Sequence, residues 1–173
     1  MQLPMLSEDV RKGAVVSPCR TYRYQLWRRW SDAALVMFLM LNPSTADETV
    51  DDRTIMKCQS FAHRWGYGGI SVYNLFAFRA TKPADMMKAR DPVGPDNDDW
   101  IINGLNTSDL VVCAWGPKGI HLGREQQVLD LLWLHHDNVT CLKVTKGGHP
   151  SHPLYLPGDL RPTRFPARKW GGK

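Results

Sequence analysis

The sequence lacks the features that would assign it to a membrane or a secreted protein. Its longest apolar run, residues 33–41, is far shorter than the roughly 20 residues that a membrane-crossing helix needs. Glu8 and Asp9 fall where a secretory signal would have its apolar stretch. We therefore expect a cytoplasmic protein with no membrane partner.

Paired cysteine motifs are also absent. None of the four cysteines belongs to a CxxC pair, and Cys58, Cys113 and Cys141 lie inside apolar-periodic segments. This pattern is typical of reduced, buried thiols. No cysteine or histidine shows a usual zinc-ligand spacing, so we expect neither a metal nor another cofactor.

The chain has only a small excess of positive charge. Its 173 residues include 22 Lys+Arg and 17 Asp+Glu, which leaves +5. Such a balance permits a polyanionic partner without requiring one. The candidate phosphate contacts gather in two groups, for which a solvated basic surface is the alternative: Arg20, Arg23, Arg28 and Arg29, and then Arg161, Arg164, Arg168 and Lys169.

The arrangement of apolar residues predicts one α/β domain. Strand patterns cover residues 22–26, 34–41, 70–76, 110–115 and 139–144, and helical spacing covers residues 55–65, 83–90, 100–105 and 124–136. We expect the first two strands to form a hairpin, and the whole to form a three-layer α/β/α sandwich with a mostly parallel central sheet. The expected divisions are an N-terminal arm (1–20), the domain (21–157) and a basic C-terminal tail (158–173).

Polar residues follow or interrupt the predicted strands, which is where parallel sheets bind ligands. Asn42 precedes Pro43, which restricts it to an extended conformation, although Ser44 or Asp47 could simply cap a helix. Asn74 lies within an apolar strand. A buried amide needs hydrogen-bond partners, which are either structural groups or the edge of a base.

Two later segments supply further candidates. Trp115 and Gly116 end the third buried strand, in a turn that allows close backbone approach. The loop of residues 145–157 carries two glycines, three prolines and the histidines His149 and His152. Loops bounded by Gly and Pro are seldom core elements, so we expect one of these imidazoles to be functional.

These motifs resemble, in their order along the chain, those of the uracil-DNA glycosylase superfamily. The quoted segments are Leu41-Asn42-Pro43-Ser44, Tyr73-Asn74-Leu75, Trp115-Gly116, His149-Pro150-Ser151 and His152-Pro153-Leu154. The span 22–157 is also similar to the domain-of-unknown-function family 1643, through LNPSTAD, DDRT, FAFRAT, DPVGPDND and HPLYLP. The resemblance implies a glycosylase-like fold and an enzyme that hydrolyses the N-glycosidic bond of a flipped-out DNA base.

The resemblance also implies roles for individual residues. Asn42 would position a water, with help from Asp47, Asp51 or Asp52. The imidazole of His152, which precedes Pro153 and Leu154 as the motif requires, would stabilise the departing base. Asn74 would recognise the base edge. The remaining candidates for substrate binding are Ser44, Phe76, Trp115, Gly116, His149, Ser151 and Leu154.

Two alternatives follow from the same residues. An amide at position 42 cannot remove a proton as a carboxylate does, which favours a nucleic-acid-binding module of the same fold without catalysis. Alternatively, Asp47, Asp51 and Asp52 would hold a divalent metal in a nucleotide or phosphate hydrolase. The simpler interpretation of these three acids is that they complement a helix dipole.

Overall fold

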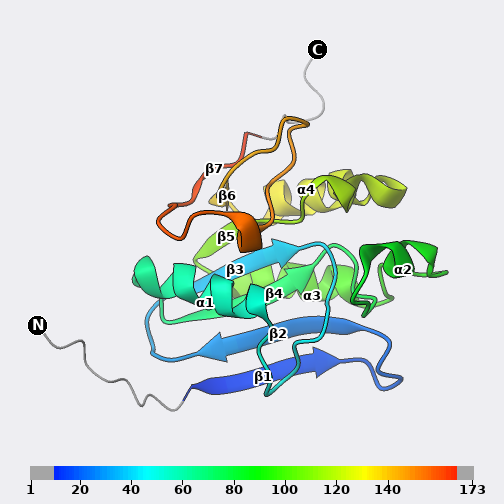
Figure 1. Ribbon diagram of the computed structural model, residues 1–173, viewed down its shortest axis with the longest axis horizontal. Coiled ribbons are helices and arrows are strands. Elements are labelled where there is room, and N and C mark those ends of the chain that lie inside the picture. Colours follow the sequence, from blue (N-terminus) through cyan, green and yellow to red (C-terminus); the bar gives the residue numbers. More distant parts are fainter. Residues whose placement is uncertain (1–9, 167–173) are drawn as a thin grey trace, which may run out of the picture.

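The computed structural model describes residues 10–166, and the candidate phosphate contacts Arg168 and Lys169 lie outside this range. Its centre is a mixed sheet of seven strands in the order β1-β2-β4-β3-β5-β6-β7 (Figure 1). The strands are β1 (Arg11–Val16), β2 (Arg23–Arg29), β3 (Leu35–Met40), β4 (Gly69–Asn74), β5 (Leu110–Cys113), β6 (Val139–Cys141) and β7 (Thr163–Arg164).

The α/β class is confirmed, but a mostly parallel sheet is not. The four central strands β4, β3, β5 and β6 are parallel to one another, whereas β1 and β2 on one side and β7 on the other pair antiparallel. The central strands are connected by helices, as parallel neighbours require. β1 and β2 are joined by a short turn, which only an antiparallel pair allows.

The predicted hairpin between the first two strand patterns is wrong. β4 lies between β2 and β3, with Leu26 opposite Val72 on one side and Phe38 beside Val72 on the other. β3 is buried along almost its whole length, as expected of a strand that needs a neighbour on each side and a helical layer on each face. β2 therefore pairs with the free edge of β4.

Helices cover both faces of the sheet. One face packs on α1 (Arg53–Arg64) through Ile55, Cys58 and Phe61. The other face packs on α3 (Asn97–Thr107) and α4 (Arg124–His135), with the short α2 (Pro83–Lys88) beside them (Figure 1). Among the described residues, no helix has both the length and the apolarity needed to cross a membrane.

Parts of the expected arm and tail belong to the sheet. Residues 11–16 form β1 and pair with β2 along its length. At the other end, β7 pairs with β6, and Phe165 is 2% exposed in the core against the ring of Trp115. The described portions of both segments thus complete the domain.

Candidate functional site

The alternation of side chains along β3 and β4 places two asparagines on the same face of the sheet. Phe38 and Met40 of β3, and Val72 of β4, belong to the core beneath α1. Because every second residue of a strand faces the same side, Asn74 continues the β4 series on that face. Met40 lies beside Asn74 in the parallel register, and Asn42 follows two residues later.

Both asparagines line one cavity of about 480 Å³ at the carboxyl ends of the central strands. That volume is within the range of about 300–1,000 Å³ that is usual for small-molecule sites. The start of α1 and the 3-10 turn η2 (Pro153–Tyr155) supply further lining residues. Of the predicted site residues, seven line the cavity: Asn42, Ser44, Asn74, Trp115, Gly116, His152 and Leu154.

Asn42 is held by two backbone carbonyls. Its Nδ2 donates to the oxygen of Ala80 at 2.8 Å and to that of Pro43 at 3.1 Å. This arrangement fixes the amide orientation, because only the nitrogen can donate. Oδ1 has no partner among the described residues and is left as an acceptor. A carboxylate at this position would be repelled by both carbonyls.

Asn74 presents a buried donor that no protein group satisfies. The residue is 2% exposed, and Nδ2 has no hydrogen-bond partner among the described residues. Its backbone oxygen accepts from Asn97 Nδ2 at 2.9 Å, which fixes the strand end rather than the side chain. A buried unpaired donor is costly, so this position is suited to a ligand acceptor.

His152 offers a defined hydrogen-bond donor. The backbone N–H of Leu154 donates to its Nδ1 at 3.2 Å, so the neutral ring carries its proton on Nε2. Burial lowers the pKa of His152 below its ordinary value, although the Asp52 carboxylate acts in the opposite direction. The neutral imidazole is thus favoured at pH 7, with one N–H for a ligand.

His149 does not line the cavity. Its Nδ1 lies 2.9 Å from Oε1 of Glu125, and the same oxygen accepts the indole N–H of Trp115 at 2.9 Å. This network orients Trp115, which is 2% exposed and forms part of the cavity wall. Of the two loop histidines, His152 is therefore the one that a ligand in the cavity would meet.

The turn after β5 has no free amide at its glycine. Gly116 adopts φ +74° and ψ −172°, a region essentially restricted to glycine. Its N–H donates to the oxygen of Pro150 at 2.7 Å. That bond ties the β5 turn to the histidine loop, so Gly116 shapes the cavity without offering this amide to a phosphate.

Three further predicted residues lie away from the cavity. Phe76 is fully buried in the core on the α3 side, and its ring contacts His121. Ser151 is bound through its backbone N–H to the oxygen of Lys143 at 2.8 Å. Asp47 accepts from the backbone N–H groups of Thr49 and Val50, which are the main cause of its lowered pKa.

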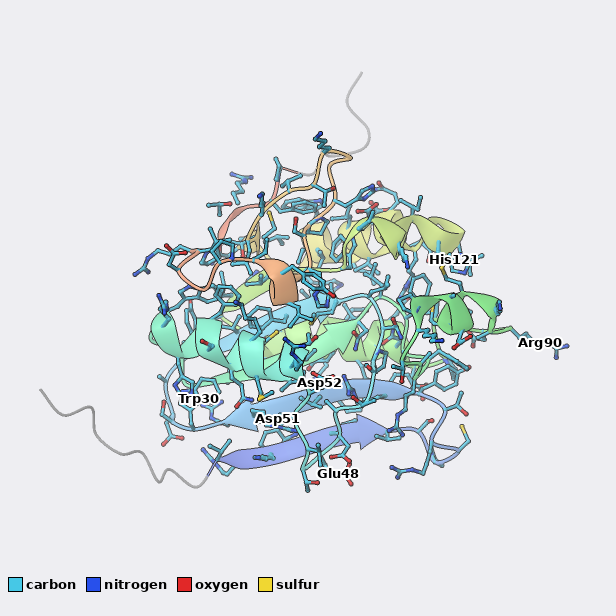
Figure 2. The ribbon with its side chains drawn as sticks, in the orientation of Figure 1. Trp30, Glu48, Asp51, Asp52, Arg90 and His121 are labelled. Atoms are coloured by element: carbon cyan, nitrogen blue, oxygen red, sulfur yellow. The ribbon has the colours of Figure 1, made fainter. Side chains whose placement is uncertain are left out.

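The three acids of the metal-site alternative have separate structural partners. Besides the Asp47 turn, Asp51 pairs with Arg28 at 2.7 Å, and Asp52 caps α1 by accepting from the N–H of Ile55 at 2.9 Å. Figure 2 shows Asp51 and Asp52 at the start of α1. No group of three or more potential metal-ligating residues occurs within residues 10–166. Only Asp52 of the three lines the cavity.

Four more charged or aromatic residues line the cavity, and of these Asp52 is considered above, as an acid that assists Asn42 or holds a metal. Arg23 opens β2, Asp52 caps α1, Lys118 follows Gly116, and Tyr155 is 85% exposed in η2. Arg23 is one of the candidate phosphate contacts of the first basic group, and it is only 3% exposed. No sequence signal separates it from a solvated arginine of the same group.

Arg23 has few partners for a buried cation. Nη1 donates to the oxygen of Ala46, whereas Nε has no partner among the described residues. Burial lowers the pKa of Arg23 to about 10, so the guanidinium stays charged at neutral pH. The cavity therefore combines two cations, two amides, a neutral imidazole and one carboxylate, which suits a polar ligand rich in acceptors.

Comparisons with known proteins identify a family but no activity. Neither the search of curated proteins nor the search of solved structures gave a match. The family described as "Protein of unknown function (DUF1643)" matches residues 23–154, a span that runs from Arg23 to Leu154 and contains every described lining residue except Tyr155. The chain belongs to the DUF1643 family.

Proposed function

We propose that the protein is a glycosylase-like hydrolase that binds a nucleotide unit of DNA, or a free nucleotide, in this cavity and cleaves its N-glycosidic bond. The observation that carries the proposal is the convergence of Asn42, Asn74 and His152 on one cavity. They come from three segments far apart in the sequence. The motif resemblance to the uracil-DNA glycosylase superfamily adds support.

The base would be bound by two hydrogen-bond donors that belong to residues lining the cavity. Asn74 Nδ2 lacks a protein acceptor, which suits an oxygen or ring nitrogen at the base edge. The Nε2–H of His152 would donate to a base oxygen that becomes negative as the bond breaks. Tyr155, exposed at the edge of the cavity, is placed to stack on a base, which contributes about 1–3 kcal/mol.

The hydrolytic step needs a water and a proton acceptor. In this scheme the C1′–N bond breaks and its electron pair goes to the base, while water oxygen bonds to C1′. Asn42 Oδ1 accepts a hydrogen bond from that water, and Asp52 takes its proton, because Asp52 is the carboxylate lining the cavity. The base anion is then protonated by solvent. Asp52 replaces Asp47 in this role.

The test is release of free base from oligonucleotides and nucleotides carrying uracil or modified pyrimidines. We expect His152→Gln and Asp52→Asn each to reduce the rate by about a hundredfold or more, the lower end of what general acid–base and donor groups provide. The matched control is His135→Gln, which changes an exposed histidine at the end of α4. No release by the folded parent from the whole panel would refute the proposal.

A second candidate function is binding without catalysis. It is favoured because two groups that the hydrolytic step needs already make structural hydrogen bonds. Asn42 Nδ2 holds two carbonyls, and Asp52 Oδ1 caps a helix. In that case the parent would bind oligonucleotides in a salt-sensitive manner without turnover. Binding that persists in an Asn42→Ala, His152→Ala double variant would place the interface outside the cavity.

A further inference from the structure

Arg23 carries a positive charge that the protein leaves without a carboxylate partner. Two other arginines are equally buried, and each has one: Arg28 pairs with Asp51 at 2.7 Å and Arg124 with Asp98 at 2.6 Å. Arg23 forms no salt bridge within the described part of the chain, although it is 3% exposed. The charges of Asp52 and Asp47 stabilise the Arg23 cation from beyond salt-bridge distance, but burial outweighs them and lowers its pKa. A buried ion without a close partner is unfavourable, so its retention beside a cavity needs an explanation.

One edge of this guanidinium, formed by the buried Nε and by Nη2, lacks a hydrogen-bond partner in the described part of the chain. Nη1 is used by the oxygen of Ala46, Nε lacks a partner, and Nη2 donates to no group within residues 10–166. Nε and Nη2 together form the planar fork that binds two oxygens of a carboxylate or a phosphate.

The other groups of the cavity favour an anion at this edge. Lys118 adds a second cation to the lining, and the unpartnered Asn74 Nδ2 adds a neutral donor. Asp52 also lines the cavity, but its Oδ1 is committed to the N–H of Ile55 and it forms no salt bridge with Arg23. The lining thus has two cations and one carboxylate, and an anion bound by Arg23 would neutralise the remaining positive charge.

We infer that Arg23 binds a phosphate group of the ligand, so that the cavity takes a phosphorylated nucleoside unit and discriminates against the uncharged nucleoside. The identity of the attached base rests on the proposed function, whereas the phosphate contact does not. The phosphate would come from a free nucleotide or from a phosphodiester of DNA, because both present two oxygens to the fork.

The experiment is calorimetric titration of the full chain with the four deoxynucleosides, their 5′-monophosphates, inorganic phosphate, and short single-stranded oligonucleotides without terminal phosphate. We expect at least one monophosphate to bind at least tenfold tighter than its nucleoside. Arg23→Met should abolish that difference. Arg90→Met removes the same charge from an exposed side chain at the far end of the molecule (Figure 2) and should retain it.

Further variants keep the result interpretable. Arg23→Lys retains the charge without the fork and should lose most of the preference, which covers the case in which Arg23→Met fails to fold. Oligonucleotides that compete with the monophosphate identify a phosphodiester as the source, and failure to compete identifies the free nucleotide. Inorganic phosphate should bind the parent more weakly than the monophosphate and should not bind Arg23→Met.

The outcomes separate this inference from the proposed function. Equal affinity for nucleoside and monophosphate, absence of binding by either, or a preference that survives Arg23→Met would overturn the phosphate site. Base release by a protein with no phosphate preference would support the proposed hydrolase and overturn the phosphate site. A phosphate preference with no base release from any substrate would support the phosphate site and overturn the hydrolase.

Discussion

Arg28 and Asp51 form an ion pair at 2.7 Å that ties the loop before α1 to β2, and the Arg28 side chain in this pair is fully buried. The same guanidinium donates to the backbone oxygens of Asp47 and Trp27 at 2.6 and 2.9 Å. Arg28 thus binds two acceptors of the loop that carries Asp52 to the cavity.

We predict that Arg28→Met lowers the free energy of unfolding by about 3 kcal/mol, at the lower end for breaking a buried pair because Asp51 keeps some solvent contact. Arg23→Met is the matched comparison. Since it removes a charge without a carboxylate partner, it should change stability by no more than about 1 kcal/mol or should stabilise. Urea unfolding measures both, and equal losses would contradict the contrast.

The stability of the protein should fall below pH 6.5 because of His152. Burial lowers the pKa of this imidazole in the folded state, so on acidification the unfolded chain takes up the proton first. The contribution of neutral His152 to the free energy of unfolding is therefore fully present above pH 6.5, the ordinary histidine pKa. It is lost as the pH falls toward the folded-state pKa.

Melting temperatures between pH 8 and pH 5 provide the measurement for His152. The parent should lose more on acidification than His152→Gln, whereas His135→Gln, altered at an exposed position, should follow the parent. Parallel curves for the parent and His152→Gln would show that this imidazole is not desolvated in solution.

Gly116→Ala should destabilise the protein by about 1–3 kcal/mol through backbone strain alone. A Cβ at this position would meet no atom within 4 Å, yet φ is +74°. Gly158→Ala is the control, since that residue has no positive φ and its nearest neighbour lies 4.0 Å away. Thermal unfolding should therefore separate the two alanines, and a similar effect of both would argue against the turn geometry.

Cys19 should be the single reactive thiol of the folded protein among its four cysteines. Hydrogen bonds from the Ser17 and then the Thr21 side chain lower the pKa of this exposed thiol to about 7, whereas burial raises the pKa values of Cys58, Cys113 and Cys141.

Alkylation by iodoacetamide should accordingly rise with pH around a midpoint of about 7 and modify one site by mass spectrometry. Ser17→Ala should move the midpoint upward, and Cys19→Ser should abolish the fast phase. Rapid modification of a buried cysteine without denaturant would disprove the assignment.

The positions of the central strands along the chain could be predicted from the sequence, but the order in which the strands pair could not. Continuous apolar residues marked β3, β4 and β5, and the helical spacing of Ile55, Cys58 and Phe61 marked α1. Strand pairing depends on contacts remote in sequence, so nothing local revealed that β4 lies between β2 and β3.

The same distinction applies to the site. The place of Asn42, Asn74 and His152 beside one cavity could be predicted. Each is a polar residue next to an apolar or proline-containing segment, where a polar side chain is unusual unless it binds something. Arg23 could not, because an isolated arginine has the same sequence appearance whether it is solvated or buried. Asp47 and Asp52 look alike in the sequence, but Asp47 accepts from the N–H of Val50 in a turn, whereas Asp52 caps α1 and lines the cavity.

The position of β4 also fixes an order of assembly. As the ribosome extends the chain, the β1–β2 unit emerges first but has no edge to join until residues 69–74 have followed. Because Arg23 belongs to β2, we expect its guanidinium to stay hydrated until β2 has paired with β4. Burial of this cation beside the cavity thus depends on a pairing between strands that lie far apart in the sequence.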